Sequence, residues 1–234
     1  MGFIKKFIVC AAFLLVPATN SGTGYAQDKN QSGVEEVALN RAESKIRDAS
    51  VVVRDPFTGS YGSGTFFEID GKNIIITAAH VVDGREYMHV IGRSNETVMG
   101  KVIYVDPNFD FAMITIPDMI SRSPVKFKMF KGDAIGTDVT YTGHPARHDL
   151  LTVRGRVVGI DKSTKSILMH SYAWMGASGS CVFTLDGKLV GVLVAVDVGR
   201  YDGRQIVEDI VWLTPILEIE LADIKMAIKV HGRS

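Results

Sequence analysis

The chain has 234 residues, of which 46% are hydrophobic and 22% charged, a balance typical of a globular protein rather than a disordered or fibrous one. Its 26 basic residues equal its 26 acidic residues. With no long run of like charge, the sequence lacks the electrostatic signature of a protein that binds nucleic acid or an anionic membrane.

The first 26 residues differ from the rest. Lys5 and Lys6 precede an apolar stretch, 7–16, and small residues surround position 26. This pattern predicts a signal peptide, 1–26, cleaved after Ala26, and hence an exported protein, periplasmic or secreted, with no stable membrane anchor. An uncleaved interfacial anchor is the alternative. Cleavage would leave Cys181 as the single cysteine, so a hydrophobic core rather than a disulfide must stabilise the fold.

Residues 27–50 form a polar extension with a weak helical pattern. Ser32 and Glu35 have the spacing of a capping box, which favours a helix that begins there. The residues expected on its inward face are Val34, Val37, Ala38, Ala42 and Ile46.

From residue 51 the pattern becomes that of β-strands, with short runs of Val, Ile, Thr, Phe and Tyr between turns. Asp70 and Gly71 between two runs indicate a hairpin. The first set of expected strands is 51–54, 64–68, 73–77, 89–91, 98–105 and 111–116. The second is 138–142, 152–160, 166–170, 181–185, 189–196 and 205–212. Two sets of six favour an all-β fold of two small barrels, about 51–120 and about 125–213.

A helix is expected to close the chain at about 214–229. Thr214 can cap it and Pro215 suits its first turn. The residues expected on its apolar face are Leu217, Leu221, Ile224 and Ile228.

Three short passages combine residue types that serve nucleophilic catalysis. Residues 76–82 read Ile-Thr-Ala-Ala-His-Val-Val, residues 108–114 Asn-Phe-Asp-Phe-Ala-Met-Ile, and residues 175–180 Met-Gly-Ala-Ser-Gly-Ser. A serine needs a base to take its proton, histidine titrates near neutral pH, and a carboxylate can fix the histidine tautomer. Glycines beside the serine leave backbone N–H groups free to face an oxyanion.

With this order of motifs the chain resembles the trypsin/chymotrypsin superfamily, and within it the bacterial proteases related to the HtrA (Deg) family. Residues 141–145 and 152–157 add to the likeness, which spans most of 51–224. The resemblance implies a double six-stranded antiparallel β-barrel (chymotrypsin-like) with a C-terminal helix. It implies a serine endopeptidase domain, 51–234, that acts on polypeptide substrates through an acyl-enzyme intermediate, without a cofactor or a metal.

Carried over residue by residue, the resemblance makes His80 the general base, Asp110 its orienting partner and Ser178 the nucleophile. The N–H groups of Gly176 and Ser178 would form the oxyanion hole. Substrate would bind in the cleft between the barrels.

The resemblance also places a pocket for the side chain before the scissile bond. Tyr172 and Ala173 would form its floor, and Val194, Ala195 and Val196 its wall. None can neutralise a buried cation, so we expect a preference for small or medium apolar residues.

Several residues compete with these assignments. Asp106 is a rival acid, but it precedes a proline in a turn. Cys181 is a rival nucleophile, but it begins a strand and is expected to be a buried thiol. Asp197 follows the pocket wall and would favour basic substrates if it faced the pocket. His144 and His148 lie four residues apart, but the proline between them favours a loop over a metal site.

The chain also departs from the family pattern. Ser180 and Cys181 stand where a second glycine and a small apolar residue are usual. No Ile/Val-Gly-Gly start precedes the first strand, so activation by trypsin-like cleavage is not implied. We expect no PDZ domain after the protease domain.

Two other classes of function compete with the endopeptidase. A catalytically inactive binding or scaffold protein on the same fold stays open as the alternative. An α/β-hydrolase esterase would need glycine where Ser180 stands, and its histidine would come last. The sequence disfavours the esterase.

Overall fold

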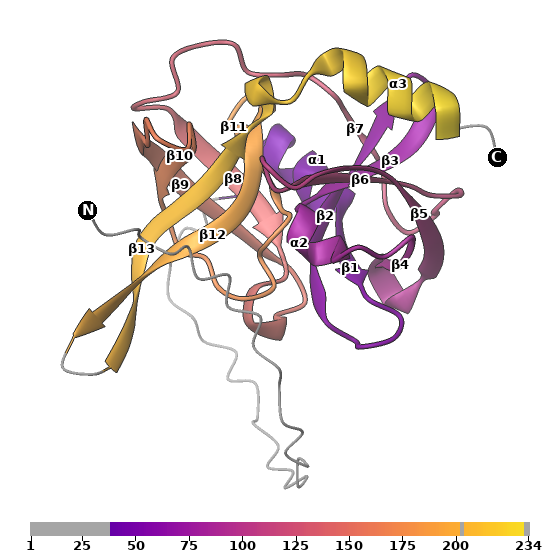
Figure 1. Cartoon of the computed structure of the whole chain (residues 1–234), viewed down its shortest axis with the longest axis horizontal. Helices are drawn as coiled ribbons and strands as arrows, with labels where there is room; N and C mark the ends of the chain where they lie inside the picture. The colour runs from indigo at the N-terminus through magenta and orange to yellow at the C-terminus, as the bar shows by residue number, and fades with distance from the viewer. Residues whose placement is uncertain (1–37, 202–203, 232–234) are drawn as a thin grey trace, which may run out of the picture. The chain divides into compact units, whose positions relative to one another are not determined.

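The chain folds into two β-barrels. The computed structural model describes residues 38–201 and 204–231, and residues 39–234 form one compact unit. In barrel one the strand order is β1-β4-β5-β6-β3-β2, and a β1–β2 pairing closes it (Figure 1). Its strands are β1 (Ser50–Arg54), β2 (Tyr61–Ile69), β3 (Lys72–Thr77), β4 (Tyr87–Ile91), β5 (Thr97–Asp106) and β6 (Phe111–Thr115). A short strand, β7 (Val125–Lys126), adds parallel to β2.

Barrel two is closed in the order β10-β13-β12-β11-β8-β9, and all its neighbouring strands are antiparallel. Its strands are β8 (Asp138–Gly143), β9 (Leu151–Ile160), β10 (Ile167–His170), β11 (Cys181–Thr184), β12 (Leu189–Tyr201) and β13 (Arg204–Pro215). The twelve strands expected from the sequence are therefore all present, and the predicted fold is confirmed. Strands β12 and β13 run further than predicted, out to residues 201 and 204.

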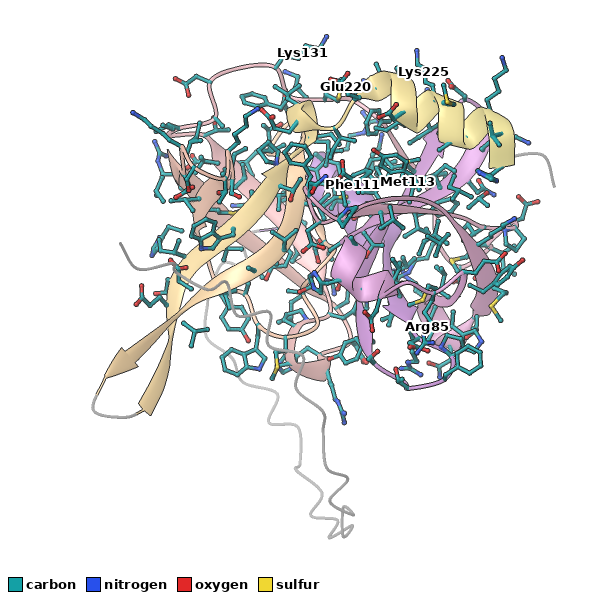
Figure 2. The ribbon with its side chains drawn as sticks, in the orientation of Figure 1. Arg85, Phe111, Met113, Lys131, Glu220 and Lys225 are labelled. Carbon is teal, nitrogen blue, oxygen red and sulfur yellow. The ribbon has the colours of Figure 1, made fainter. Side chains whose placement is uncertain are left out.

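The two barrels share part of their core. The alternating apolar residues of barrel one fill its interior, where the labelled Phe111 and Met113 are fully buried (Figure 2). The same cluster takes in Phe183 from barrel two, whose ring stacks on that of Phe67 with centroids 6.0 Å apart. Burying this surface joins the barrels through the hydrophobic effect.

The first helix begins later than its sequence pattern suggested. Helix α1 (Arg41–Ala49) is capped by Asn40, whose side chain accepts from the Glu43 N–H while the Glu43 carboxylate accepts from the Asn40 N–H. The proposed cap at Ser32 and Glu35 lies outside the described residues, as do Val34 and Val37. Of the expected inward face, Ile46 is buried and Ala42 half-buried, whereas Ala38 is exposed and precedes the helix.

The prediction of a helix from Thr214 was wrong. Strand β13 continues to Pro215, a short 3-10 turn, η3, covers Ile216–Glu218, and helix α3 covers Leu221–His231. Thr214 instead donates its hydroxyl to the Phe109 carbonyl. Ile224 and Ile228 are buried as expected. Leu217, in η3, and Leu221, the first residue of α3, are exposed, contrary to the expected apolar face. No helix within 38–201 and 204–231 is long and apolar enough to cross a membrane.

Candidate active site

His80 and Asp110 meet where two neighbouring strands of barrel one end. Thr77 at the end of β3 pairs with Ala112 near the start of β6. His80 lies on the short helix α2 (Ala79–Val82) that follows β3. The Asp110 carboxylate accepts from the His80 backbone N–H at 2.8 Å and lies 2.7 Å from His80 Nδ1. One carboxylate thus fixes both the backbone and the imidazole of His80.

The turn before β6 gives Asp110 this orientation. Asp110 has a φ of 50°, in the left-handed region, which aspartate tolerates better than most side chains. Asp106 holds the same turn, because its carboxylate accepts from the N–H groups of Asn108 and Phe109 at 2.9 and 3.2 Å. Asp106 is thus the last residue of β5, and its side chain supports the turn that follows.

Ser178 lies in a tight turn of barrel two, between β10 and β11. Its carbonyl accepts from the Ser63 N–H of barrel one at 2.8 Å. Gly62 separates this carbonyl from Val81, since a Cβ at Gly62 would lie 2.8 Å from the Ser178 oxygen and 2.6 Å from a Val81 methyl carbon. The serine segment and the histidine segment therefore pack against the same residue. The Ser178 side chain is half-buried.

The backbone N–H groups of Gly176 and Ser178 are among those of this segment that have no protein acceptor in the described part of the chain. The carbonyls of the same two peptides are both held. Met175 O accepts from Ala146 N–H at 2.8 Å, and Ala177 O accepts from Ser180 N–H at 3.0 Å. Because C=O and N–H point in opposite directions across a trans peptide, these bonds fix the direction of both free donors.

Only glycine fits at position 176. Its φ is +96°, and a Cβ there would lie 2.5 Å from the His144 carbonyl oxygen and 2.8 Å from the Tyr61 hydroxyl. The sequence motif contains this glycine because both the backbone conformation and the close packing require it.

The residues predicted to form the specificity pocket belong to adjoining strands and turns. Tyr172 is 46% exposed and its carbonyl accepts from the Tyr141 hydroxyl at 2.8 Å, whereas Ala173 is buried. Val194, Ala195 and Val196 lie on β12. Ala173 and Val196 contribute to the same apolar cluster of barrel two. Val194 packs instead against the apolar cluster that the two barrels share.

Asp197 has a hydrogen-bond partner of its own, and Cys181 is a buried thiol. The Asp197 carboxylate accepts from the indole N–H of Trp212 at 2.6 Å. The Cys181 thiol is fully buried, as expected, and burial raises its pKa to about 12, which keeps it neutral.

A charged cavity of about 620 Å³ lies beside Tyr172. Its lining comprises Asp138, Val139, Arg154, Gly155, Arg156, His170, Ser171, Tyr172, Leu185 and Asp209. Sequence analysis did not point to this cavity. Within it the Arg156 guanidinium pairs with Asp138 at 2.6 Å.

His144 and His148 do not form a metal site. A 3-10 turn, η2 (Pro145–Arg147), lies between them, so the two rings are not presented on one helix face. His144 is buried, and its Nε2 has no hydrogen-bond partner in the described chain. Burial, with Arg122 nearby, lowers the pKa of His144 to about 4, so this ring is neutral at pH 7.

Comparison with known proteins assigns the class. Residues 62–192 match the model of the trypsin-like peptidase domain, and the chain belongs to this family. It is 31% identical over 144 residues to a probable periplasmic serine endoprotease, DegP-like, of Bartonella henselae, a match that covers 58% of this chain and 28% of that protein. It is 27% identical over 188 residues to a serine protease HtrA-like of Staphylococcus aureus, covering 71% of this chain and 24% of that protein.

Solved structures share the fold. A serine endoprotease from Yersinia pestis aligns with a TM-score of 0.66 at 20% identity, over 84% of this chain and 68% of that one. The inactive form of Rv3671c from M. tuberculosis aligns with a TM-score of 0.62 at 16% identity, over 87% of this chain and 96% of that one. The chymotrypsin-like double barrel is therefore confirmed. The chain spans less than a third of the length of the two curated relatives.

Proposed function

We propose that this protein is a serine endopeptidase in which His80, Asp110 and Ser178 form the catalytic triad. The observation that carries the proposal is the His80–Asp110 pair, at 2.7 Å, beside a turn that offers Ser178 and two unpaired N–H groups. Membership of the trypsin-like peptidase family and relatives named as serine endoproteases support it.

The chemistry follows from these groups. His80 Nε2 takes the proton of Ser178 Oγ as that oxygen attacks the substrate carbonyl, and Asp110 stabilises the positive charge that develops on the ring. The N–H groups of Gly176 and Ser178 donate to the oxyanion of the tetrahedral intermediate. His80 then gives the proton to the leaving amine, and water releases the acyl group from Ser178 by the same steps in reverse.

The proposed specificity is for small or medium apolar side chains before the scissile bond. Ala173, Val194, Ala195 and Val196 offer no charge, and an unpaired cation in an apolar pocket would cost several kcal/mol. The indole of Trp212 holds Asp197, the residue that would have favoured a basic substrate.

Export is part of the proposal. The name of the Bartonella relative describes a periplasmic protein, and residues 1–26 have the pattern of a signal peptide. The tests are N-terminal sequencing of the exported protein, expected to begin at Gln27, and fractionation. Intact Met1 in a membrane fraction would contradict cleavage.

Labelling with a fluorophosphonate tests the nucleophile. Such a reagent phosphonylates a serine that is activated by a neighbouring base, so we expect label on the peptide that contains Ser178 and none in Ser178→Ala or His80→Ala. Ser180→Ala is the matched control, because this serine lies two residues away with a buried hydroxyl. A folded wild-type protein that takes no label would favour the alternative, an inactive scaffold.

A further inference from the structure

Strand β2 of barrel one presents three hydroxyl groups toward barrel two. Tyr61, Ser63 and Thr65 alternate along the strand, so their side chains lie on one face. Each makes a hydrogen bond with barrel two, Tyr61 with the loop that follows β8, and Ser63 and Thr65 with the segment that carries Ser178. Arg147 N–H donates to Tyr61 Oη at 2.9 Å, Ser63 Oγ donates to Gly176 O at 2.7 Å, and Cys181 N–H donates to Thr65 Oγ1 at 3.2 Å.

Two of these hydroxyls also hold the loop that follows β8. His144 N–H donates to Ser63 Oγ at 2.9 Å, so the loop is tied to β2 at residues 144 and 147. Between the two ties, Ala146 and Arg147 have φ values of 53° and 64°, which L side chains rarely adopt. A loop in this conformation depends on the bonds at its two ends.

The loop in turn holds the peptide that carries one oxyanion donor. Ala146 N–H donates to the Met175 carbonyl at 2.8 Å. Since the Met175–Gly176 peptide is planar and trans, this bond turns the Gly176 N–H the opposite way. Without it, rotation of this peptide could place the Met175 carbonyl where the donor now lies, and a carbonyl oxygen repels an oxyanion.

We propose that Tyr61 and Ser63 are positioning residues for the oxyanion hole. Ser63 holds the Gly176 carbonyl directly, and together with Tyr61 it holds the 144–147 loop that fixes the Gly176 N–H. The inference rests on the proposed function, because it concerns stabilisation of an oxyanion formed on Ser178. It differs from the triad assignment in that both hydroxyls act through hydrogen bonds to other protein groups.

Ser63→Ala and Tyr61→Phe remove one hydroxyl each and keep the remaining side-chain atoms. We expect kcat to fall by roughly 10- to 100-fold while KM changes by less than about 3-fold, because the lost interaction exists only in the transition state. The matched control is Ser50→Ala, which removes a fully buried hydroxyl bonded to a single carbonyl, that of Thr142 at 3.1 Å. Its kcat and KM should equal those of the wild type.

A peptide boronate separates positioning from general destabilisation. The serine oxygen adds to boron, its proton passes to His80, and the resulting tetrahedral adduct carries the negative charge that the oxyanion hole binds. In Ser63→Ala and Tyr61→Phe the boronate Ki should rise by the same factor by which kcat/KM falls. Measurements are made below the melting temperature of every variant.

A merely structural role predicts a lower melting temperature with unchanged kcat, KM and boronate Ki in the folded enzyme, and that result would overturn the inference. If Ser63→Ala does not fold, Tyr61→Phe alone tests the inference, since Tyr61 is half-buried. An active wild type with both variants behaving like Ser50→Ala rejects only the positioning role. A wild type that neither cleaves peptides nor binds the boronate rejects the proposed function, and this inference with it.

Discussion

Asp110 uses both carboxylate oxygens on one histidine, one for the backbone N–H of His80 and one for its ring. An asparagine at this position keeps a single acceptor oxygen and presents an amide N–H₂ in place of the other. Asp110→Asn should therefore favour the wrong tautomer of His80 and lower kcat by about 10⁴-fold, with little change in melting temperature. Steady-state kinetics and thermal unfolding check this, and a kcat above a tenth of the wild-type value would count against the assignment.

In the proposed mechanism Ser178 and His80 act in one step, so the losses of activity from changing each should not add. Ser178→Ala and His80→Ala should each lower kcat by on the order of 10⁴-fold or more, and the double variant should lose little beyond either one. Independent, multiplying effects would show that the two side chains do not work together.

Ser180 has a fully buried hydroxyl with no hydrogen-bond partner in the described chain. Burying an unsatisfied hydroxyl costs about 1–3 kcal/mol, so Ser180→Ala should leave stability unchanged or raise it by about 1 kcal/mol. Urea unfolding measures the change. A loss of more than about 1 kcal/mol would reveal a hydrogen bond that this account lacks.

The pocket residues predict what the enzyme cleaves. A peptide library should show cutting after Val, Ala or Leu, with a preference of about 10- to 200-fold per mismatched group. Asp197→Asn should leave this profile unchanged, because Trp212 holds the carboxylate. Dominant cutting after Arg or Lys would refute the apolar pocket and point to Asp197 or to the acidic residues of the neighbouring cavity.

Helix α1 is the element that ties the N-terminal segment to barrel two. Its buried Glu43 pairs with Arg154 through two bonds of 2.5 and 2.7 Å, and this partner lowers the pKa of Glu43. Arg154→Ala would leave a buried carboxylate without its partner and should lower the melting temperature. Glu43→Gln, which retains the capping geometry, should lower it less.

Thermal unfolding of both variants decides this point. If Glu43→Gln lowered the melting temperature more than Arg154→Ala does, an unpaired buried charge would not be the main cost of breaking the pair.

The strands could be predicted from the sequence because their apolar residues alternate and glycine or Asp/Asn turns separate them. The helix starts could not. Thr214 and Pro215 look like a cap and a first turn, but their segment pairs with β12, and tertiary pairing overrides the local signal. Asn40 and Glu43 form the cap that sequence analysis overlooked, in favour of a similar spacing at Ser32.

The residues of the site also differ in how well the sequence predicts them. The sequence indicated His80, Asp110, Ser178 and Gly176, since each lies in a short motif whose chemistry requires that residue type. Tyr61 and Ser63 gave only a weak signal, alternating hydroxyls on an otherwise apolar strand. Their role depends on a loop more than 80 residues away, His144 being 81 residues from Ser63, and a local motif cannot encode such contacts.

The proposed catalytic groups come from two barrels that share core residues and are joined by hydrogen bonds. The Ser63 N–H and hydroxyl make two of these bonds, and Phe67 stacks on Phe183. We therefore expect the barrels to unfold together, since separating them would expose apolar surface and break buried hydrogen bonds.

The buried His144 makes the free energy of unfolding depend on pH. Its pKa is lowered from 6.5 to about 4 in the folded protein, so the unfolded chain binds the proton more readily between these values. Stability should fall as pH drops from about 6.5 to about 4, by about 3 kcal/mol from this group. His144→Gln cannot titrate, so its unfolding free energy should lose less over that range. Equal slopes for the two proteins would contradict this assignment.

Casein hydrolysis by the purified protein, beside its Ser178→Ala variant, tests the central claim most directly. The account predicts proteolysis by the wild type and a loss of on the order of 10⁴-fold or more in the variant, with its fold retained by circular dichroism. Full activity in Ser178→Ala, or no activity in a folded wild type, would contradict it.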